Sequence, residues 1–485
     1  CCTAAARVQI LSIGDHNLHQ RALFRAYPGE RLAFPLFCSV TVRVIWWRAF
    51  PQIPGVCGVQ KARRKTSRPA LHVQADLDVE GRRHALVPLI ENAYLLVLLT
   101  DILVFALFAA SLFFIMGPGG LHSFGHAAYF GLGAYGAAML AKNGRLAYSV
   151  AVGQQDLETR DGMTERSIFR IYSMTKSVTA VAVMMLVDAG KASLSDPVSK
   201  FLPEFADVRV GLPDGTTRPP SRPITVADLL LHTSGLEHRT SAEYQQAGVR
   251  SRRIGLPQFV RNIVRVPLKE DPGTRFRYSE GTTVLGRLVE VWSGLPFDTF
   301  LEQRIFRPLA MGDTMFWADA AQGPRLTTVY GPRSGGGLRA IEIEAVPFSE
   351  KPALLEGAVG LLSTVGDYLR FAQMLLNGGT LDGVRILQPQ TVARMVVNGL
   401  PPDVLAARGG GVMGWGLANV NVVMDPASAP YASNRGEYGW DGTAGTIFWV
   451  DPQTETVVVL LTQSSPADPD RLRRRFKSLV QQSVH

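Results

Sequence analysis

The sequence predicts an α/β fold, in which helices flank an antiparallel sheet and a mostly helical segment is inserted between its strands. Three observations point to it. Asn143-Gly144 joins two largely apolar runs, and this pair favours the type I′ turn of a hairpin, expected over residues 137–153. Two further apolar, strand-like runs lie far along the chain, at 445–450 and 456–461. Residues 177–189 read as an apolar helix that ends at Gly190, so both ends of this region are expected to share one sheet.

The first 83 residues form a basic head without a recognisable repeat or hydrophobic period, and we expect it to be disordered. Residues 1–83 carry 13 basic and 5 acidic side chains, or +8 of the net charge of +9, so the remaining chain is nearly neutral. The basic run from Lys61 to Lys65 is expected to be solvated. No nucleic-acid partner is expected, because no nucleic-acid-binding motif accompanies this run.

An apolar segment follows at 84–134. Its centre, from Tyr94 to Met116, is 23 residues long with Asp101 as its one charge, which is long enough to cross a bilayer. We expect one transmembrane helix there, with a buried core helix as the alternative because a carboxylate is costly in lipid. The protein is then membrane-associated through residues 94–116 if the segment inserts, and cytoplasmic otherwise. Residues 91–142, including LLTDILVFALFAASL, resemble a fragment of the permease subunit of branched-chain amino-acid ABC transporters, but they are too few to enclose a transport path.

A serine and a lysine with the spacing of an acyl-enzyme site precede the helix at 177–189. Ser173-Met174-Thr175-Lys176 follows a strand-like lead-in at 168–172. A serine hydroxyl needs a base to remove its proton, and a lysine three residues further on a helix lies one turn away on the same face. Backbone N–H groups at a helix N-terminus also converge on an oxyanion formed there. Taken alone, Ser173 is equally consistent with a plain helix N-cap.

Two further motifs follow in chain order, Tyr278-Ser279-Glu280 and Trp440-Asp441-Gly442, the second just before the strand-like run at 445–450. From residue 135 onward, the sequence lacks the residues and motifs that several other catalytic mechanisms need. All four cysteines precede residue 84, so no disulfide or Cys-ligated zinc is expected from residue 135 onward, and we expect neither a metal nor a cofactor. The sequence contains no Gly-x-Ser-x-Gly elbow and no phosphate-binding Gly-x-x-x-x-Gly-Lys loop.

The segment IFRIYSMTKSVTAVAVMMLVDAGKASLSDPVSKFLPEF resembles the nucleophile segment of the class C β-lactamase-like serine hydrolases, which include penicillin-binding proteins, D-alanyl peptidases and family VIII carboxylesterases. ITVADLLLHTSGL, FRYSEGTTVLGRLVEVWSG and GAVGLLSTVGDYLRFAQMLLNGG follow in the family's order. The resemblance covers about residues 135–485 and implies a β-lactamase/transpeptidase-like fold with a helical insert at about 191–339.

The resemblance also implies a role for each motif residue. Ser173 becomes the nucleophile, Lys176 its general base, and Tyr278 the phenol that moves a proton between nucleophile and leaving group. The backbone N–H groups of Ser173 and Thr443 form the oxyanion hole. The substrate-binding residues are Trp440, Asp441 and Gly442. His232, in the His-Thr-Ser-Gly turn, is expected to have a structural role.

Two departures from the family pattern bear on the substrate. Glu280 stands in place of the usual Asn of Tyr-x-Asn, and we expect it to be solvated or bonded within its loop. Trp440 stands where many members carry Lys or His, either of which helps to hold a substrate carboxylate. An indole offers one N–H and no charge. Esterases of this family commonly carry Trp there, so the expected function is that of a carboxylesterase for short-chain neutral esters, with a small-molecule ester as its partner.

Two alternatives remain at this point. The first is a β-lactamase or D-alanyl-D-alanine carboxypeptidase. The second is a non-catalytic β-lactamase-like binding protein, against which the intact Ser173, Lys176 and Tyr278 argue. The sequence indicates no oligomeric state.

Overall fold

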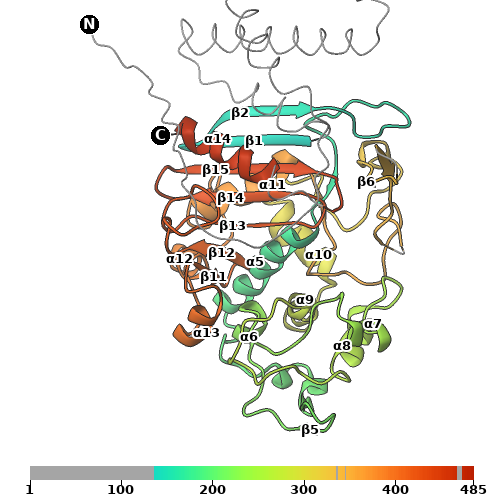
Figure 1. The fold of residues 1–485 in the computed structure, drawn as a ribbon, viewed down its shortest axis with the longest axis vertical. Coiled ribbons are helices and arrows are strands. Elements are labelled where there is room, and N and C mark those ends of the chain that lie inside the picture. Colours follow the sequence, from blue (N-terminus) through green and yellow to red (C-terminus); the bar gives the residue numbers. More distant parts are fainter. Residues whose placement is uncertain (1–135, 335–336, 345, 467–471, 485) are drawn as a thin grey trace, which may run out of the picture. The chain divides into compact units, whose positions relative to one another are not determined.

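A computed structural model of the chain describes residues 136–334, 337–344, 346–466 and 472–484. Its main sheet has seven strands in the order β11-β12-β13-β14-β15-β1-β2, and each neighbouring pair is antiparallel (Figure 1). The first hairpin therefore joins the sheet beside its last strand. The strands are β1 (Gly136–Lys142), β2 (Arg145–Val152), β11 (Met413–Gly416), β12 (Val420–Val423), β13 (Tyr438–Asp441), β14 (Ile447–Asp451) and β15 (Thr456–Thr462).

Helices cover both faces of this sheet. Phe448 of β14 packs on Tyr368 of α11 (Val365–Leu376), with ring centroids 5.0 Å apart. Its neighbour Trp449 packs on Phe476 of α14 (Arg474–Val484), at 5.9 Å. Successive side chains of a strand point to opposite faces, so α11 covers one face and α14 the other. Burial on both sides explains why β15 is a continuous apolar run without polar alternation.

Between β2 and β11 the regular elements are mainly short helices joined by long turns and loops. The central helix of this region, α9 (Gly281–Ser293), packs against α5 (Thr175–Asp188), α6, α8 and α10. Gly286 allows the close approach of α10, because a Cβ at this position would lie 3.2 Å from the ring of Phe297. The remaining helices are α6 (Val226–Leu230), α7 (Ala242–Gln246), α8 (Leu256–Ile263), α10 (Phe297–Leu301), α12 (Pro389–Met395) and α13 (Pro402–Ala407).

Among the described residues, short strands form four small two-stranded sheets outside the main one. They are β3 (Phe169–Arg170) with β8 (Leu362–Ser363), β4 (Val210–Gly211) with β5 (Thr217–Arg218), β6 (Tyr330–Pro332) with β7 (Leu338–Ala340), and β9 (Thr380–Leu381) with β10 (Val384–Arg385).

The predicted hairpin is confirmed. Asn143 and Gly144 join β1 to β2 with φ values of 52° and 71°, the positive values that a type I′ turn needs. The predicted runs at 445–450 and 456–461 correspond to β14 and β15, and the predicted helix at 177–189 to α5. The strand-like lead-in expected at 168–172 is shorter than predicted, because β3 pairs only with the two residues of β8.

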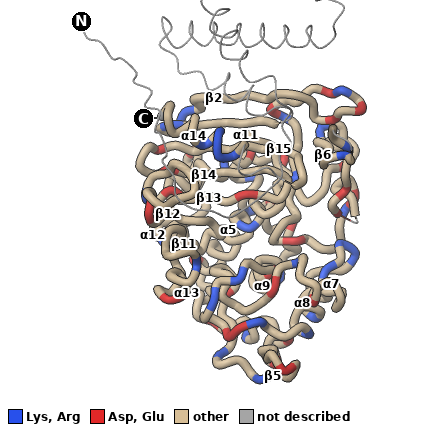
Figure 2. Tube along the Cα trace, in the orientation of Figure 1, with Lys and Arg blue, Asp and Glu red and all other residues tan. Residues whose placement is uncertain are grey.

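The basic head and the segment 84–134, including the transmembrane helix expected from Tyr94 to Met116, lie outside the described residues. Within the residues that the structure does describe, no helix is both long and apolar enough to cross a membrane. Figure 2 shows basic and acidic residues interspersed along the described chain, in keeping with its nearly neutral charge balance.

Candidate active site

The candidate nucleophile lies in a strained turn that leads into a buried helix. Ser173 is the middle residue of a 3₁₀ turn, Tyr172–Met174, which runs directly into α5. Tyr172 has a φ of 42°, in the left-handed region that bulky residues rarely adopt, and its side chain is fully buried. Backbone strain of this kind persists only where the surrounding packing enforces it, and it is concentrated at functional sites.

Lys176 lies one helical turn after Ser173 on α5 and is 1% exposed. Its Nζ donates a hydrogen bond of 3.0 Å to the carbonyl oxygen of Ala358 and lies 4.6 Å from the centroid of the Tyr278 ring. The fold therefore brings the candidate base beside the candidate phenol, although their motifs are far apart in the sequence. Ala358 carries no side-chain chemistry, so sequence reasoning had no signal for its part in holding Lys176.

A buried ion pair fixes the segment that holds Lys176. Glu356, two residues before Ala358, is fully buried, and its two carboxylate oxygens accept hydrogen bonds from Nε and Nη2 of Arg250, the second of 2.7 Å. Burial disfavours the charged carboxylate, but the Arg250 guanidinium outweighs it and holds the pKa of Glu356 below its usual value. This pair anchors the carbonyl to which the lysine binds.

Trp440 of β13 completes the group around Tyr278. Its Nε1 donates a hydrogen bond of 3.0 Å to the phenol oxygen, and the two ring centroids are 5.3 Å apart. Trp415 of β11, fully buried, packs edge-on against Trp440 at 4.6 Å and fixes its orientation. Because the indole supplies a donor to the phenol oxygen, the phenol's own hydrogen can be directed to another acceptor. Trp415 was missed by the sequence reasoning because β11 itself was not predicted.

The turn after β13 packs against the nucleophile segment. A Cβ on Gly442 would lie 2.5 Å from the carbonyl oxygen of Ile171, two residues before Ser173, so only glycine allows this approach. Thr443 follows in an exposed turn. The backbone of 442–443 thus lies beside the start of the helix that carries Ser173.

The Asp441 side chain takes the opposite direction from Trp440, as neighbours on a strand must. Its carboxylate accepts a hydrogen bond from Nη1 of Arg473, just before α14. The structure therefore brings Lys176, Tyr278 and Trp440 into one group, with Ser173 in the turn that leads into the helix of Lys176, and it turns the Asp441 side chain away from Trp440.

His232 supports the loop that carries Tyr278. It is fully buried, and its Nδ1 accepts a hydrogen bond of 3.2 Å from the backbone N–H of Ser279. Burial, and secondarily the charge of Lys176, hold the pKa of His232 well below its usual value. A neutral ring bonded to the backbone fits the structural role expected for this residue.

The expectation of a solvated Glu280 was wrong, and the alternative of bonding near its own loop describes it better. Glu280 is 1% exposed, and its Oε2 accepts a hydrogen bond of 2.8 Å from Thr283 at the start of α9. Burial, followed by repulsion from Glu356, raises the pKa of the Glu280 carboxyl. Sequence reasoning failed here because the burial of Ser279 and Glu280 is set by the packing of distant residues around them.

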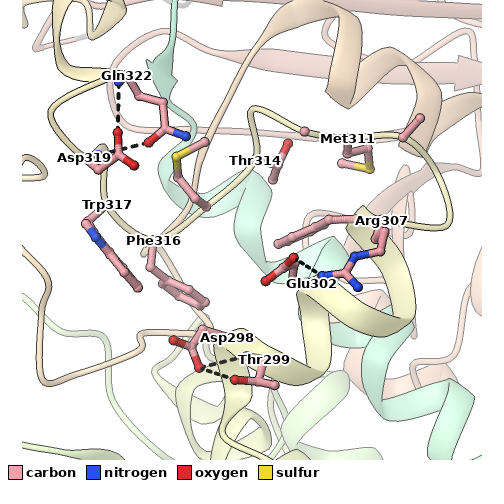
Figure 3. A pocket seen from close by; sticks show the side chains of 14 residues that line it. Asp298, Thr299, Glu302, Arg307, Met311, Thr314, Phe316, Trp317, Asp319 and Gln322 are labelled. Carbon is pink, nitrogen blue, oxygen red and sulfur yellow. Dashed lines mark hydrogen bonds and ion pairs between the residues drawn. The ribbon is translucent and has the colours of Figure 1, made fainter.

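The structure also contains a cavity of about 670 Å³ (Figure 3). It is lined by α10 and the chain that follows it up to Gln322, and none of the predicted site residues contributes to its walls. Several of its polar side chains are bonded to one another; Glu302, for example, accepts a hydrogen bond of 2.8 Å from Arg307. The cavity holds no arrangement like that around Ser173.

His238 should make the stability of the fold depend on pH. Its ring stacks on Tyr278 at 5.8 Å, and burial, followed by the charges of Lys176 and Arg239, lowers its pKa to about 4 from 6.5. The unfolded chain therefore binds a proton that the folded chain excludes as the pH falls from about 6.5 to 4. We expect the melting temperature to fall as the pH is lowered through this window. Above about pH 6.5 the ring is neutral in both states, so His238 no longer makes stability depend on pH.

The measurement is calorimetric melting at about pH 7 and pH 4.5. His238→Gln should reduce the difference between the two melting temperatures, while His232, still present, accounts for part of what remains. An equal difference in parent and variant would contradict this assignment.

The fold, together with the family match and the relatives that follow, defines a serine hydrolase that acts through an acyl-enzyme. Residues 131–482 match the model of the family described as Beta-lactamase, and the chain belongs to that family. Protein Rv1367c of Mycobacterium tuberculosis (strain ATCC 25618 / H37Rv) is 34% identical over 333 residues, which cover 65% of this chain and 82% of the relative. Esterase EstB of Burkholderia gladioli is 30% identical over 354 residues, covering 68% and 85%.

Among solved structures, "EstCE1, a hydrolase with promiscuous acyltransferase activity" superposes with a TM-score of 0.64 at 26% identity, covering 73% of this chain and 95% of that one. The comparisons give no support to the resemblance of residues 91–142 to a permease, and the beta-lactamase match begins within that segment, at residue 131. They also give no support to membrane association.

Proposed function

We propose that this chain is a carboxylesterase that hydrolyses short-chain neutral esters. One observation carries the proposal: the strand position beside the nucleophile is filled by Trp440, whose Nε1 donates to the Tyr278 phenol at 3.0 Å. A lysine or histidine there would offer a cation to a substrate carboxylate. The indole uses its single N–H within the protein and presents an apolar ring to the substrate instead.

Ser173, Lys176 and Tyr278 are proposed as the catalytic residues. Oγ of Ser173 attacks the ester carbonyl carbon while its proton passes to Lys176, directly or through the Tyr278 hydroxyl. The carbonyl oxygen becomes an oxyanion that accepts hydrogen bonds from the backbone N–H groups of Ser173 and Thr443. The bond to the alcohol then breaks, and the alcohol oxygen takes the proton. Water attacks the acyl-enzyme through the same groups, with release of the carboxylic acid and of Ser173.

The comparisons support the choice of substrate class. The relative from Burkholderia gladioli is named an esterase, and the structural neighbour EstCE1 is named a hydrolase with acyltransferase activity. We also propose residues 135–485 as the hydrolase domain, with the helical insert at about 191–339. We propose that Trp440 and Gly442 contact the substrate. Asp441 points to the other face of the strand, and its proposed role is to support this segment through its bond to Arg473.

Replacing Trp440 by lysine should shift the preference toward anionic substrates. A charge-assisted hydrogen bond to a carboxylate is worth about 1.5–3 kcal/mol, or roughly 10- to 150-fold in kcat/KM. The parent should prefer p-nitrophenyl butyrate to nitrocefin, and Trp440→Lys should move the ratio of the two kcat/KM values toward nitrocefin by that factor.

Trp440→Phe is the matched control, because it keeps an aromatic ring and adds no charge. It should lower ester turnover through the lost bond to Tyr278 while leaving the preference for the neutral substrate in place. A parent that prefers nitrocefin would favour the β-lactamase alternative. An unmoved ratio in Trp440→Lys would show that this residue does not select the substrate.

A further inference from the structure

Arg473, which lies just before α14, binds the turn that follows Trp440. It approaches the turn from the face of the sheet that α14 covers, opposite to the face that α11 covers. Its side chain is 6% exposed. Besides its bond to the Asp441 carboxylate, its Nη2 donates to two backbone carbonyl oxygens of the turn, at 2.7 Å to Gly442 and 3.1 Å to Thr446. One planar guanidinium therefore fixes the turn at three points.

The bond to the Gly442 carbonyl bears on the oxyanion hole through the geometry of one peptide unit. The carbonyl of Gly442 and the N–H of Thr443 belong to the same planar trans peptide, in which C=O and N–H point in opposite directions. Holding the carbonyl toward Arg473 therefore directs the N–H of Thr443 away from α14, to the side where Gly442 meets the backbone of Ile171. Within the described part of the chain, that N–H donates to no other protein atom.

The turn itself is rigid enough to transmit this constraint. The N–H of Gly442 donates to the carbonyl of Thr446 at 2.9 Å, and the N–H of Gly445 donates to the carbonyl of Gly442 at 3.1 Å. The Thr446 hydroxyl in turn donates to the carbonyl of Ile171 at 3.3 Å. A shift of the guanidinium would thus tilt the 442–443 peptide relative to the nucleophile segment.

We propose that Arg473 is a positioning residue for the oxyanion hole: by binding the Gly442 carbonyl it aims and polarises the N–H of Thr443 toward the oxygen of the tetrahedral intermediate. The inference rests on the proposed acyl-enzyme chemistry at Ser173. A cation bonded to the carbonyl end of a peptide strengthens the donor at its N–H end, because hydrogen-bonded groups polarise one another. Arg473 touches no substrate, and its effect is exerted through the peptide.

Docking of α14 does not by itself require these bonds. Lys477, one turn further along, pairs with the buried Glu437, and Gln481 donates to the same carboxylate at 3.1 Å. Phe476 and Val480 supply the apolar contact of the helix with the sheet. Lys477→Met is therefore a matched control, because it disturbs the attachment of the same helix without touching the turn.

The experiment uses the full chain and the variants Arg473→Met, Arg473→Lys and Lys477→Met, with the melting temperature of each recorded. Three quantities are measured: kcat and KM for p-nitrophenyl butyrate, the inhibition constant of butylboronic acid, and the rate at which a fluorophosphonate labels Ser173. The boronate and the phosphonate both place an oxygen in the oxyanion hole. Removing one donor from such a hole typically costs about 10²- to 10³-fold in kcat.

Displacing the N–H of Thr443 should lower kcat less than removing an oxyanion-hole donor altogether. We expect Arg473→Met to lower kcat roughly 10- to 100-fold, with KM within about threefold, and to weaken butylboronic acid and slow labelling by a similar factor. Arg473→Lys, which can keep one bond to the turn, should be intermediate. Lys477→Met should lower the melting temperature and keep kcat within about threefold of the parent.

The outcomes separate this inference from the proposed function. If the parent hydrolyses the ester through Ser173 but a folded Arg473→Met or Arg473→Lys keeps the parent's kcat, the function stands and the inference is overturned. A fall in kcat without weaker boronate binding also overturns it. If the parent does not hydrolyse the ester but is labelled at Ser173, and Arg473→Met slows that labelling, the inference stands and the ester substrate does not. A parent that is not labelled at Ser173 overturns both.

Discussion

Ser173→Ala is expected to reduce ester hydrolysis by roughly 10⁶-fold in kcat, the typical cost of removing a nucleophile. The variant should stay folded, because Ser173 is half-buried in its turn and the change removes one oxygen without opening a large cavity. The measurement is the hydrolysis of p-nitrophenyl butyrate by purified parent and variant, with melting curves recorded for both.

Ser177→Ala provides the matched control, because Ser177 lies on α5, about one turn after Ser173, and is fully buried. It loses the same oxygen without touching the proposed nucleophile, so its kcat should stay within about tenfold of the parent value. If Ser173→Ala retains activity within tenfold, another residue is the nucleophile.

Replacing Lys176 should have the second largest effect, because Lys176 is the proposed base and its removal would leave the proposed nucleophile without one. Loss of the base costs about as much as loss of the nucleophile where the two act as one unit, so we expect kcat to fall roughly 10⁴- to 10⁶-fold. Lys176→Met keeps the length and apolar stem of the side chain but has no amine. Lys176→Arg keeps the charge but has a group that is always protonated and cannot accept a proton.

Both variants should lose activity, and fluorophosphonate labelling of Ser173 should slow in both. The pair separates two roles for the residue. Substantial activity in Lys176→Arg combined with its loss in Lys176→Met would mean that Lys176 acts through its positive charge and that another group accepts the proton. Activity in both variants would remove Lys176 from the mechanism.

The sequence predicted those helices, strands and turns that are determined by their own residues. Asn143-Gly144 specifies its own turn, and the long apolar runs of α5 and β15 specify their own type and approximate length. β11 and β12 were missed because each is only four residues long, and β11 contains two glycines. Such strands are stabilised by pairing with neighbours rather than by the preferences of their residues.

The candidate site likewise has features that its local sequence predicts and features that depend on distant packing. Lys176 follows Ser173 by three residues across the start of a helix, so the sequence could predict that they lie one turn apart. The bond from Trp440 to Tyr278 depends on which face of β13 meets the helical layer, and that is set by distant packing. The period of two along a strand could have indicated that Asp441 points away from Trp440. The carbonyl of Ala358, by contrast, leaves no trace in the sequence, because every residue has one.

The pairing of β1 with β15 has a consequence for biosynthesis. Gly136 lies opposite Thr462, so the strand that opens the described sheet is bonded to the strand that completes it. A ribosome adds about 5–20 residues per second, and the apolar segment from Ala137 to Leu140 therefore leaves it long before the partner strand exists. Contacts between such distant parts of a chain also form slowly. Until the partner strand is made, the apolar strand β1 has an unpaired edge, which is a feature that favours aggregation.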